Sequence, residues 1–277
     1  MKPTSPVTLQ PSADGLPSHS AFPGTSAALV VAHPGHELRL YGWLRLTRPT
    51  VFVLTDGSGH TGRSRLSSTT KLAAEAGLRF GRIYGRFRDI DIYEAVLDRD
   101  FQVFTSLTDE LTLELVKDET AYVVGDAIEG YNPAHDVCRM IINAAVELSK
   151  RRHGHEIANF DFLLVGNPSA GSEIDRSICV RLGRTTYSQK LTAAAEYTDL
   201  NRDVGQALGS FGAEAFQVEY LRPVDSSFDH GLFDEPPFYE QYGERQVSKG
   251  YYDRVLRHRE HMVPLSEALN SYVERNS

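Results

Sequence analysis

The feature that most constrains this sequence is a short apolar run that ends abruptly in histidines. Residues 28–32 read Ala-Leu-Val-Val-Ala, and a short apolar run with β-branched residues is typical of a strand buried on both faces. The next five residues read His-Pro-Gly-His-Glu, and helical spacing of apolar residues begins at Leu38. Ligands of open α/β sheets bind where such strands end. His33 and His36 are therefore candidate ligands of a metal ion, although a histidine pair could also simply cap and pack this turn.

Strand-like and helix-like segments alternate along most of the chain. Because alternating strands and helices build parallel sheets, the pattern predicts an α/β fold with a mainly parallel, doubly wound sheet. The predicted strands are residues 28–32, 50–54, 83–84, 121–125, 160–165, 178–182 and 216–221, and the predicted helices include 63–77, 90–97, 101–116, 187–208 and 247–273.

Composition divides the chain into three parts. Residues 1–26 are rich in Ser, Pro, Thr and Gly and lack periodicity, so we expect a flexible N-terminal segment. Residues 27–224 form the predicted α/β domain. Residues 225–277 shift towards aromatic, proline and charged residues, and we expect a partly helical C-terminal extension packed on that domain.

Composition and charge narrow the class of protein. The net charge of −8 argues against a nucleic-acid partner, which favours a basic surface. We expect no membrane partner either, because no apolar run reaches the roughly 20 residues of a membrane span. We expect no secretory signal, because no apolar stretch precedes residue 27, and we interpret the two cysteines as buried free thiols, so the predicted location is cytoplasmic. The sequence leaves open whether the chain forms a homo-oligomer.

A third histidine is predicted at a second strand end. Asn132 is a good N-cap and Pro133 suits the first position of the helix that follows residues 121–125. His135 then lies in the first helical turn. A helix N-terminus disfavours a protonated imidazole, which keeps the ring able to donate a lone pair. Three protein ligands with an open fourth position are the pattern of a catalytic zinc.

Together these segments resemble the PIG-L/LmbE-like family of zinc-dependent N-deacetylases. Residues 33–37 are similar to the family's AHPDDE motif, and residues 132–135, Asn-Pro-Ala-His, are similar to its HPDH motif. Residues 54–59 and 190–197 resemble two further family segments, and the resemblance runs from residue 27 to 224. It implies a Rossmann-like fold and removal of acyl groups from amino sugars. It also implies a zinc ion, or another divalent metal, held by His33, His36 and His135.

The sequence departs from the family's two motifs at positions that the family uses for catalysis. The family's general base corresponds to Gly35, and the first histidine of HPDH corresponds to Asn132. Loss of a general base typically lowers a rate by about 10²–10⁴-fold. Either another group accepts the proton, or the chain no longer hydrolyses amides in the family's way.

Position along the chain suggests replacements. Asp56 and Asp126 follow predicted strands and are the candidate proton acceptors, although an aspartate before glycine also often makes a turn. The side-chain amide of Asn132 remains a hydrogen-bond donor. Three loop residues at the same edge of the sheet are predicted to bind substrate: His60, Tyr131 and Arg63. For Tyr131 the alternative is an aromatic residue that is simply exposed on the surface.

Two functions of different classes follow. The first is a metal-dependent hydrolase of the N-deacetylase type, acting on an acylated amino sugar or a sugar-bearing natural product. The alternative is a family member without standard hydrolysis that binds a sugar-like small molecule or performs another metal-assisted reaction. Gly35 and Asn132 favour the alternative, and the three histidines favour the first.

Overall fold

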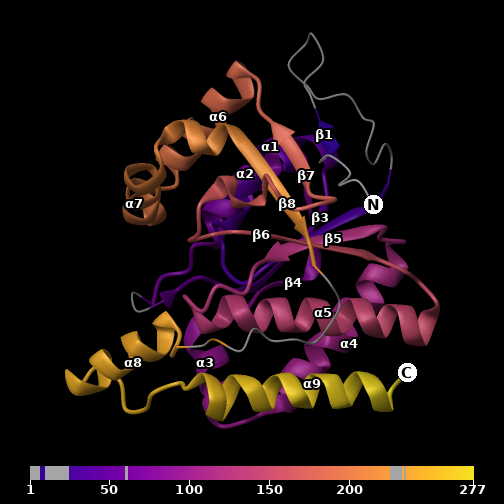
Figure 1. The fold of residues 1–277 in the computed structure, drawn as a ribbon, viewed down its shortest axis with the longest axis vertical. Coiled ribbons are helices and arrows are strands. Elements are labelled where there is room, and N and C mark those ends of the chain that lie inside the picture. Colours follow the sequence, from indigo (N-terminus) through magenta and orange to yellow (C-terminus); the bar gives the residue numbers. More distant parts are fainter. Residues whose placement is uncertain (1–6, 10–24, 60–61, 225–232, 234) are drawn as a thin grey trace.

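The structure is a computed structural model that describes residues 7–9, 25–59, 62–224, 233 and 235–277. Eight strands in this part of the chain form one sheet in the order β1-β7-β8-β6-β5-β2-β3-β4, with helices on both faces (Figure 1). The strands are β1 (Val7–Leu9), β2 (Ala27–Val31), β3 (Thr50–Thr55), β4 (Arg79–Phe87), β5 (Tyr122–Asp126), β6 (Ala158–Phe162), β7 (Ile178–Arg181) and β8 (Val218–Pro223).

The sheet is mainly parallel, which confirms the predicted fold class. The exception is β8, which runs antiparallel to both of its neighbours, β6 and β7. The chain passes from β2 to β3 and then to β4 on one side, and continues from β5 to β6 on the other. The strand order therefore reverses between β2 and β5, which pair directly. Such a reversal point is where open α/β sheets bind ligands.

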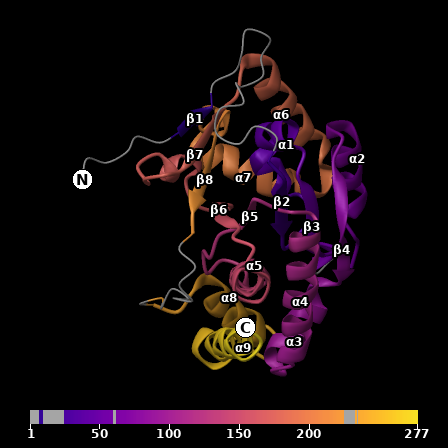
Figure 2. The same ribbon diagram turned by 90° about the vertical axis from the view of Figure 1, so that its right-hand side faces the viewer.

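The helices form a layer on each side of the sheet (Figures 1 and 2). One core contains side chains of α3, α4, α5 and α9, and the other contains side chains of α1 and α2 together with residues around α6. The helices are α1 (Tyr41–Thr47), α2 (Leu66–Ala76), α3 (Asp89–Leu97), α4 (Phe101–Lys117), α5 (Pro133–His153), α6 (Arg184–Glu196), α7 (Asn201–Phe211), α8 (Phe238–Ser248) and α9 (Val263–Arg275).

Strand β2 is buried on both faces, as its apolar run predicts. Ala28 and Val30 belong to the core under α5, whereas Leu29 and Val31 belong to the core under α1. Successive residues of a strand point to opposite faces, so only a continuous apolar run satisfies both layers. The carboxyl end of β2 is therefore fixed at the centre of the sheet.

The structure differs from the sequence prediction in two helices and in part of the N-terminal segment. The helix expected over 187–208 is two helices, α6 and α7, because Tyr197 turns inward between them and is 3% exposed. The helix expected over 247–273 is wrong at its start: α8 ends at Ser248, and a π-helical turn (His258–Met262) precedes α9. Residues 7–9 form a strand on β7, whereas the remainder of the predicted flexible segment up to residue 24 lies outside the described residues.

The C-terminal helix α9 packs against α4 and α5. Its buried residues Leu265, Leu269 and Val273 share one apolar core with α5. Among the helices of the described residues, none has the length and apolar content needed to cross a membrane. Cys138 and Cys179 are both buried free thiols.

The start of α1 is held by a buried ion pair. Glu219 on β8 accepts hydrogen bonds from the backbone N–H groups of Gly42 and Trp43, at 2.9 and 2.8 Å, and pairs with Lys190 at 2.8 Å. The carboxylate thus satisfies N–H groups that a helix start leaves without intrahelical partners. The indole of Trp43 in turn donates to the hydroxyl of Tyr122 at 3.3 Å.

Arg139 joins α5 to two strands from inside the core. The side chain is 2% exposed. Its Nε donates to the carbonyl of Asp126 at 2.6 Å, its Nη1 to Oδ1 of Asn159 at 2.8 Å, and its Nη2 to the carbonyl of Phe160 at 3.0 Å. A buried guanidinium is tolerated only when its donors are paired in this way.

The Arg139→Met substitution should lower the free energy of unfolding by about 3 kcal/mol, because it leaves three buried acceptors without a donor. Chemical denaturation measures this change. Arg79→Met is the matched control: Arg79 pairs with Asp118 from a largely exposed position, and loss of such a pair should cost less than about 1 kcal/mol. Equal effects of the two substitutions would contradict the role given to Arg139.

Candidate metal centre

Three imidazole rings meet at the point where the strand order reverses. The centroid of the His33 ring lies 5.3 Å from that of His36 and 5.0 Å from that of His135, and the last two are 4.5 Å apart. His33 follows β2, His36 begins a 3₁₀ turn (His36–Leu40), and His135 lies in the first turn of α5. The structure therefore brings the three predicted metal ligands together.

The His33 ring is oriented by groups at the ends of β3 and β4. Its Nδ1 lies 2.8 Å from Oγ1 of Thr55 and 3.0 Å from Oδ1 of Asp89. Asp89 is buried, and its Oδ2 accepts the backbone N–H of Gly59 at 2.5 Å. Although burial raises the pKa of Asp89, the contacts with His33, Thr55 and Gly59 outweigh it and hold the pKa well below its usual range.

A second carboxylate orients the His36 ring. Nδ1 of His36 lies 3.0 Å from both oxygens of Asp126. Asp126 is fully buried at the end of β5, and its Oδ2 also accepts the backbone N–H of Ala32 at 2.8 Å. A carboxylate on one ring nitrogen of a histidine is the common arrangement around metal-bound imidazoles, because it leaves the other nitrogen facing the ion.

Two ring nitrogens in the cluster lack partners. Nε2 of His33 and Nδ1 of His135 are buried and have no hydrogen-bond partner among the described residues. Burial lowers the pKa of His36 and of His135 well below the usual value, and the neighbouring histidines lower it further. Neutral imidazoles with buried, unpartnered nitrogens have the donor chemistry of a zinc site.

The nitrogens are not yet arranged around one point. Among the described residues, no three His, Cys, Asp or Glu side chains have the arrangement of a metal site. The donor types and the two unpartnered nitrogens nevertheless fit the chemistry of a zinc ion. That His33, His36 and His135 bind a metal ion stays a prediction.

Gly35 gives the loop between the histidines its shape. Its φ angle is +104°, a backbone conformation that L-residues with side chains rarely adopt. A Cβ at this position would lie 2.1 Å from Cδ1 of Leu200. The backbone N–H of Gly35 donates to Oε2 of Glu37 at 2.7 Å, so Glu37 stabilises the loop locally.

Asp56 and Asn132 both make the local contacts expected of turn and cap residues. Oδ1 of Asp56 accepts the backbone N–H of Ser58 at 2.9 Å. Oδ1 of Asn132 accepts the backbone N–H of Ala134 at 2.9 Å and the hydroxyl of Tyr93 at 3.0 Å. None of the hydrogen bonds described for Asn132 uses its Nδ2, which remains a donor.

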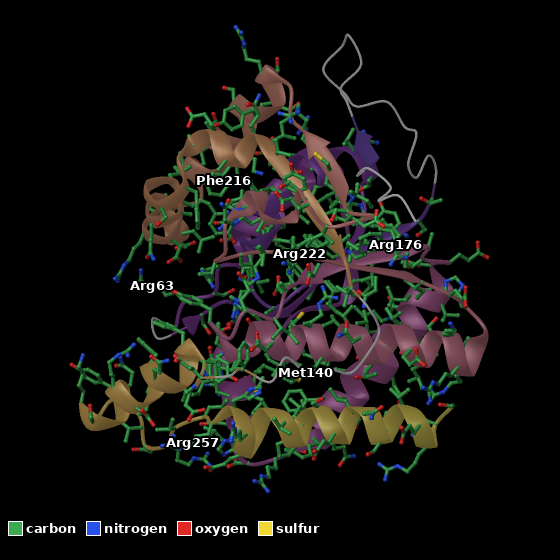
Figure 3. All side chains as sticks on the ribbon, in the orientation of Figure 1. Arg63, Met140, Arg176, Phe216, Arg222 and Arg257 are labelled. Atoms are coloured by element: carbon green, nitrogen blue, oxygen red, sulfur yellow. The ribbon has the colours of Figure 1, made fainter. Side chains whose placement is uncertain are left out.

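The predicted substrate-binding residues lie in different surroundings. Tyr131 is 39% exposed and stacks on Phe238, with centroids 4.9 Å apart and planes 7° apart. Arg63 is exposed on the segment between β3 and α2, at the left-hand edge of the molecule in Figure 3. His60 lies outside the described residues.

Sequence reasoning missed Thr55 and Asp89. Both follow or end strands, as His33 and Asp126 do, so the rule that identified the histidines applies to them as well. Asp89 was overlooked because the sequence predicts only residues 83–84 of β4, whereas the strand runs to Phe87, two residues before Asp89.

Comparisons with known proteins give structural likeness only. No protein-family model and no curated protein matches the sequence. The zinc-inhibited form of teicoplanin deacetylase Orf2 is similar with a TM-score of 0.47 and 12% identity, over 73% of this chain and 100% of that one. The A40926 pseudoaglycone deacetylase Dbv21 is similar with a TM-score of 0.46 and 15% identity, over 73% of this chain and 98% of that one. At these values the function has to be argued from the chain's own residues.

Gly35→Ala should lower the free energy of unfolding by about 1–3 kcal/mol, the usual range for a side chain held at such a φ angle. Gly205→Ala is the control, because Gly205 lies within α7 and a Cβ there meets nothing within 4 Å. That substitution should instead stabilise the protein by about 0.5–1 kcal/mol. Thermal and denaturant unfolding of both variants measure the difference, and a neutral Gly35→Ala would contradict the conformational requirement.

Proposed function

We propose that the protein is a metal-dependent amide hydrolase of the N-deacetylase type, with His33, His36 and His135 as ligands of a zinc ion. The substrate we propose is an acylated amino sugar or a sugar-bearing natural product. The observation that carries the proposal is the convergence of three imidazoles, from two strand ends, on the point where the strand order reverses. The resemblance of residues 33–37 and 132–135 to the family's two motifs supports the choice of reaction.

Zinc suits this donor set because neutral imidazoles are its common ligands. The chemistry that a bound zinc ion supplies is polarisation of the acyl carbonyl and a lowered pKa of the attacking water. Asp126 and Asp89 are positioning residues in this proposal, since each contacts Nδ1 of a histidine. Each contact engages Nδ1 of its ring and leaves Nε2 as the nitrogen that can bind a metal ion.

Two roles need a residue in this proposal: accepting the proton, for which Gly35 has no side chain, and donating a hydrogen bond to the acyl oxygen. Both oxygens of Asp126 are engaged by His36 and Ala32, so Asp126 is a poor proton acceptor. We assign proton acceptance to Asp56, which is partly exposed and uses one oxygen for its turn. The Nδ2 of Asn132 donates a hydrogen bond to the oxygen of the acyl group as negative charge develops there.

A specific observation favours a second function, binding of a sugar-like ligand without hydrolysis. Leu200 and Tyr197 occupy the space beside Gly35 where a side chain would extend. The position that corresponds to the family's general base is therefore filled by apolar groups. If Asp56 does not replace that base, the protein binds a metal ion and a sugar-like ligand but does not hydrolyse the ligand.

Zinc content and deacetylation distinguish the two functions. The purified protein should bind about one zinc ion per chain and release acetate from N-acetylated amino sugars, because three protein ligands with an open fourth position form a catalytic-type site. His33→Ala should lose both properties, whereas His153→Ala, at an exposed histidine of α5, should keep both. Bound zinc without turnover of any acylated amino sugar would favour the second function, and absence of zinc binding would contradict both metal-based proposals.

Asp126→Asn should weaken zinc affinity by about 10–100-fold, the usual effect of losing a carboxylate behind a metal-bound histidine. Competition with a chromophoric chelator measures the affinity without any assay of activity. Asp161→Asn is the control, because Asp161 lies on the neighbouring strand β6 and pairs with Arg222 rather than with a histidine. An unchanged affinity in Asp126→Asn would contradict the positioning role given to Asp126.

A further inference from the structure

Four aromatic side chains form a continuous exposed surface, here called the aromatic platform. Tyr131 stacks on Phe238, the Phe238 ring lies 6.0 Å from Tyr242 with planes 28° apart, and Tyr242 lies 6.4 Å from Tyr252. The four residues are 39%, 43%, 41% and 44% exposed. Large aromatic side chains are usually more buried than this in a folded domain, so this surface is available to a ligand.

The helix α8 presents the aromatic platform on one face. Phe238 and Tyr242 are four residues apart and therefore neighbours on the helix surface. Tyr239 and Gly243, one position further along, are the buried residues of α8. The guanidinium of Arg245 lies 5.7 Å from the Phe238 ring and 6.0 Å from the Tyr242 ring. An exposed apolar face beside a cationic group is thus built into this helix.

The aromatic platform is fixed to the loop that leads into α5. The backbone N–H of Tyr239 donates to the carbonyl of Gly130 at 3.2 Å, and its hydroxyl lies 2.9 Å from Nδ1 of His258. Gly130 has a φ angle of +62°, and a Cβ there would meet Phe233 and Pro237 at 2.8 and 2.9 Å. These contacts hold α8 against the residue that precedes Tyr131.

The aromatic platform is also continuous with the candidate metal centre. Tyr131 directly precedes Asn132, the N-cap of the helix that carries His135. Tyr93 links the two regions, because its hydroxyl donates to Asn132 at 3.0 Å. Burial raises the pKa of Tyr93, and nearby Asp89, Tyr252 and Tyr242 raise it further. Tyr93 is thus hydrogen-bonded to the residue that lies between Tyr131 and the helix carrying His135.

We propose that the aromatic platform binds a ring of the substrate that lies next to its acylated amino sugar, stacking against the flat face of that ring. The proposal rests on the proposed function in that both concern one ligand. A pyranose ring and an aryl group both offer such a face, and tyrosine hydroxyls and Arg245 at the edge suit the polar substituents of either. Continuity with the metal centre favours a ligand of that centre over a separate protein partner.

The test compares three probes of increasing extent: the methyl glycoside of N-acetylglucosamine, its phenyl glycoside, and the methyl glycoside of di-N-acetylchitobiose. Titration calorimetry on the full chain should show that at least one two-ring probe binds about tenfold more tightly than the single-ring probe, the size expected for one aromatic stacking contact. The phenyl and disaccharide probes separate an aryl neighbour from a sugar neighbour.

Tyr242→Ala and Phe238→Ala should remove the advantage of the two-ring probe and leave the affinity for the single-ring probe unchanged. Tyr251→Ala is the matched control, because Tyr251 is 74% exposed and lies outside the aromatic platform. Two-ring probes that bind no better than the single-ring probe, or an advantage that survives both substitutions, would overturn the proposal. So would sedimentation showing that Tyr242→Ala abolishes self-association instead, because the surface would then be a contact between copies.

Titration and deacetylation measured together on the intact protein separate this proposal from the proposed function. Tighter binding of a two-ring probe without any deacetylation would support the aromatic platform and contradict the hydrolase. Deacetylation with no two-ring preference would support the hydrolase and contradict the aromatic platform. A two-ring preference that persists in His33→Ala would show that stacking does not depend on the metal centre.

Discussion

The carboxylate of Asp126 connects the two strands between which the strand order reverses. It accepts the backbone N–H of Ala32, just after β2, and contacts the ring of His36 in the next turn. The backbone carbonyl of Asp126 is held in turn by the buried Arg139. A fully buried carboxylate is tolerated only when its oxygens are paired. The centre of the sheet and the orientation of one candidate ligand therefore depend on the same group.

Much of this arrangement could be predicted because burial on two faces leaves a clear pattern. Ala28 to Ala32 must be apolar throughout to serve both cores, and polar residues can only begin where the strand ends. The same reasoning located His135, since Asn132 and Pro133 mark the start of α5 without ambiguity. The three histidines that this reasoning singled out lie together in the structure.

The residues that escaped prediction lie on elements with weaker patterns. Strand β4 is at the edge of the sheet and only partly buried, so it lacks a continuous apolar run and Asp89 at its end was overlooked. Helix α8 buries only Tyr239 and Gly243, which gives no apolar periodicity, and the predicted helix therefore began at Val247. The aromatic side chains of α8 form a continuous surface only together with Tyr131, which is more than 100 residues away in the sequence.

Trp43, at the start of α1, has a consequence for optical measurements. It is the only tryptophan of the chain, and it is buried on the face of the sheet opposite to α5 and α9. Its emission reports the polarity around α1 and Tyr122, whereas the tyrosines of the aromatic platform are excited at shorter wavelength on the opposite layer. Selective excitation of this single tryptophan therefore follows loosening of the layer that contains α1 without any attached dye.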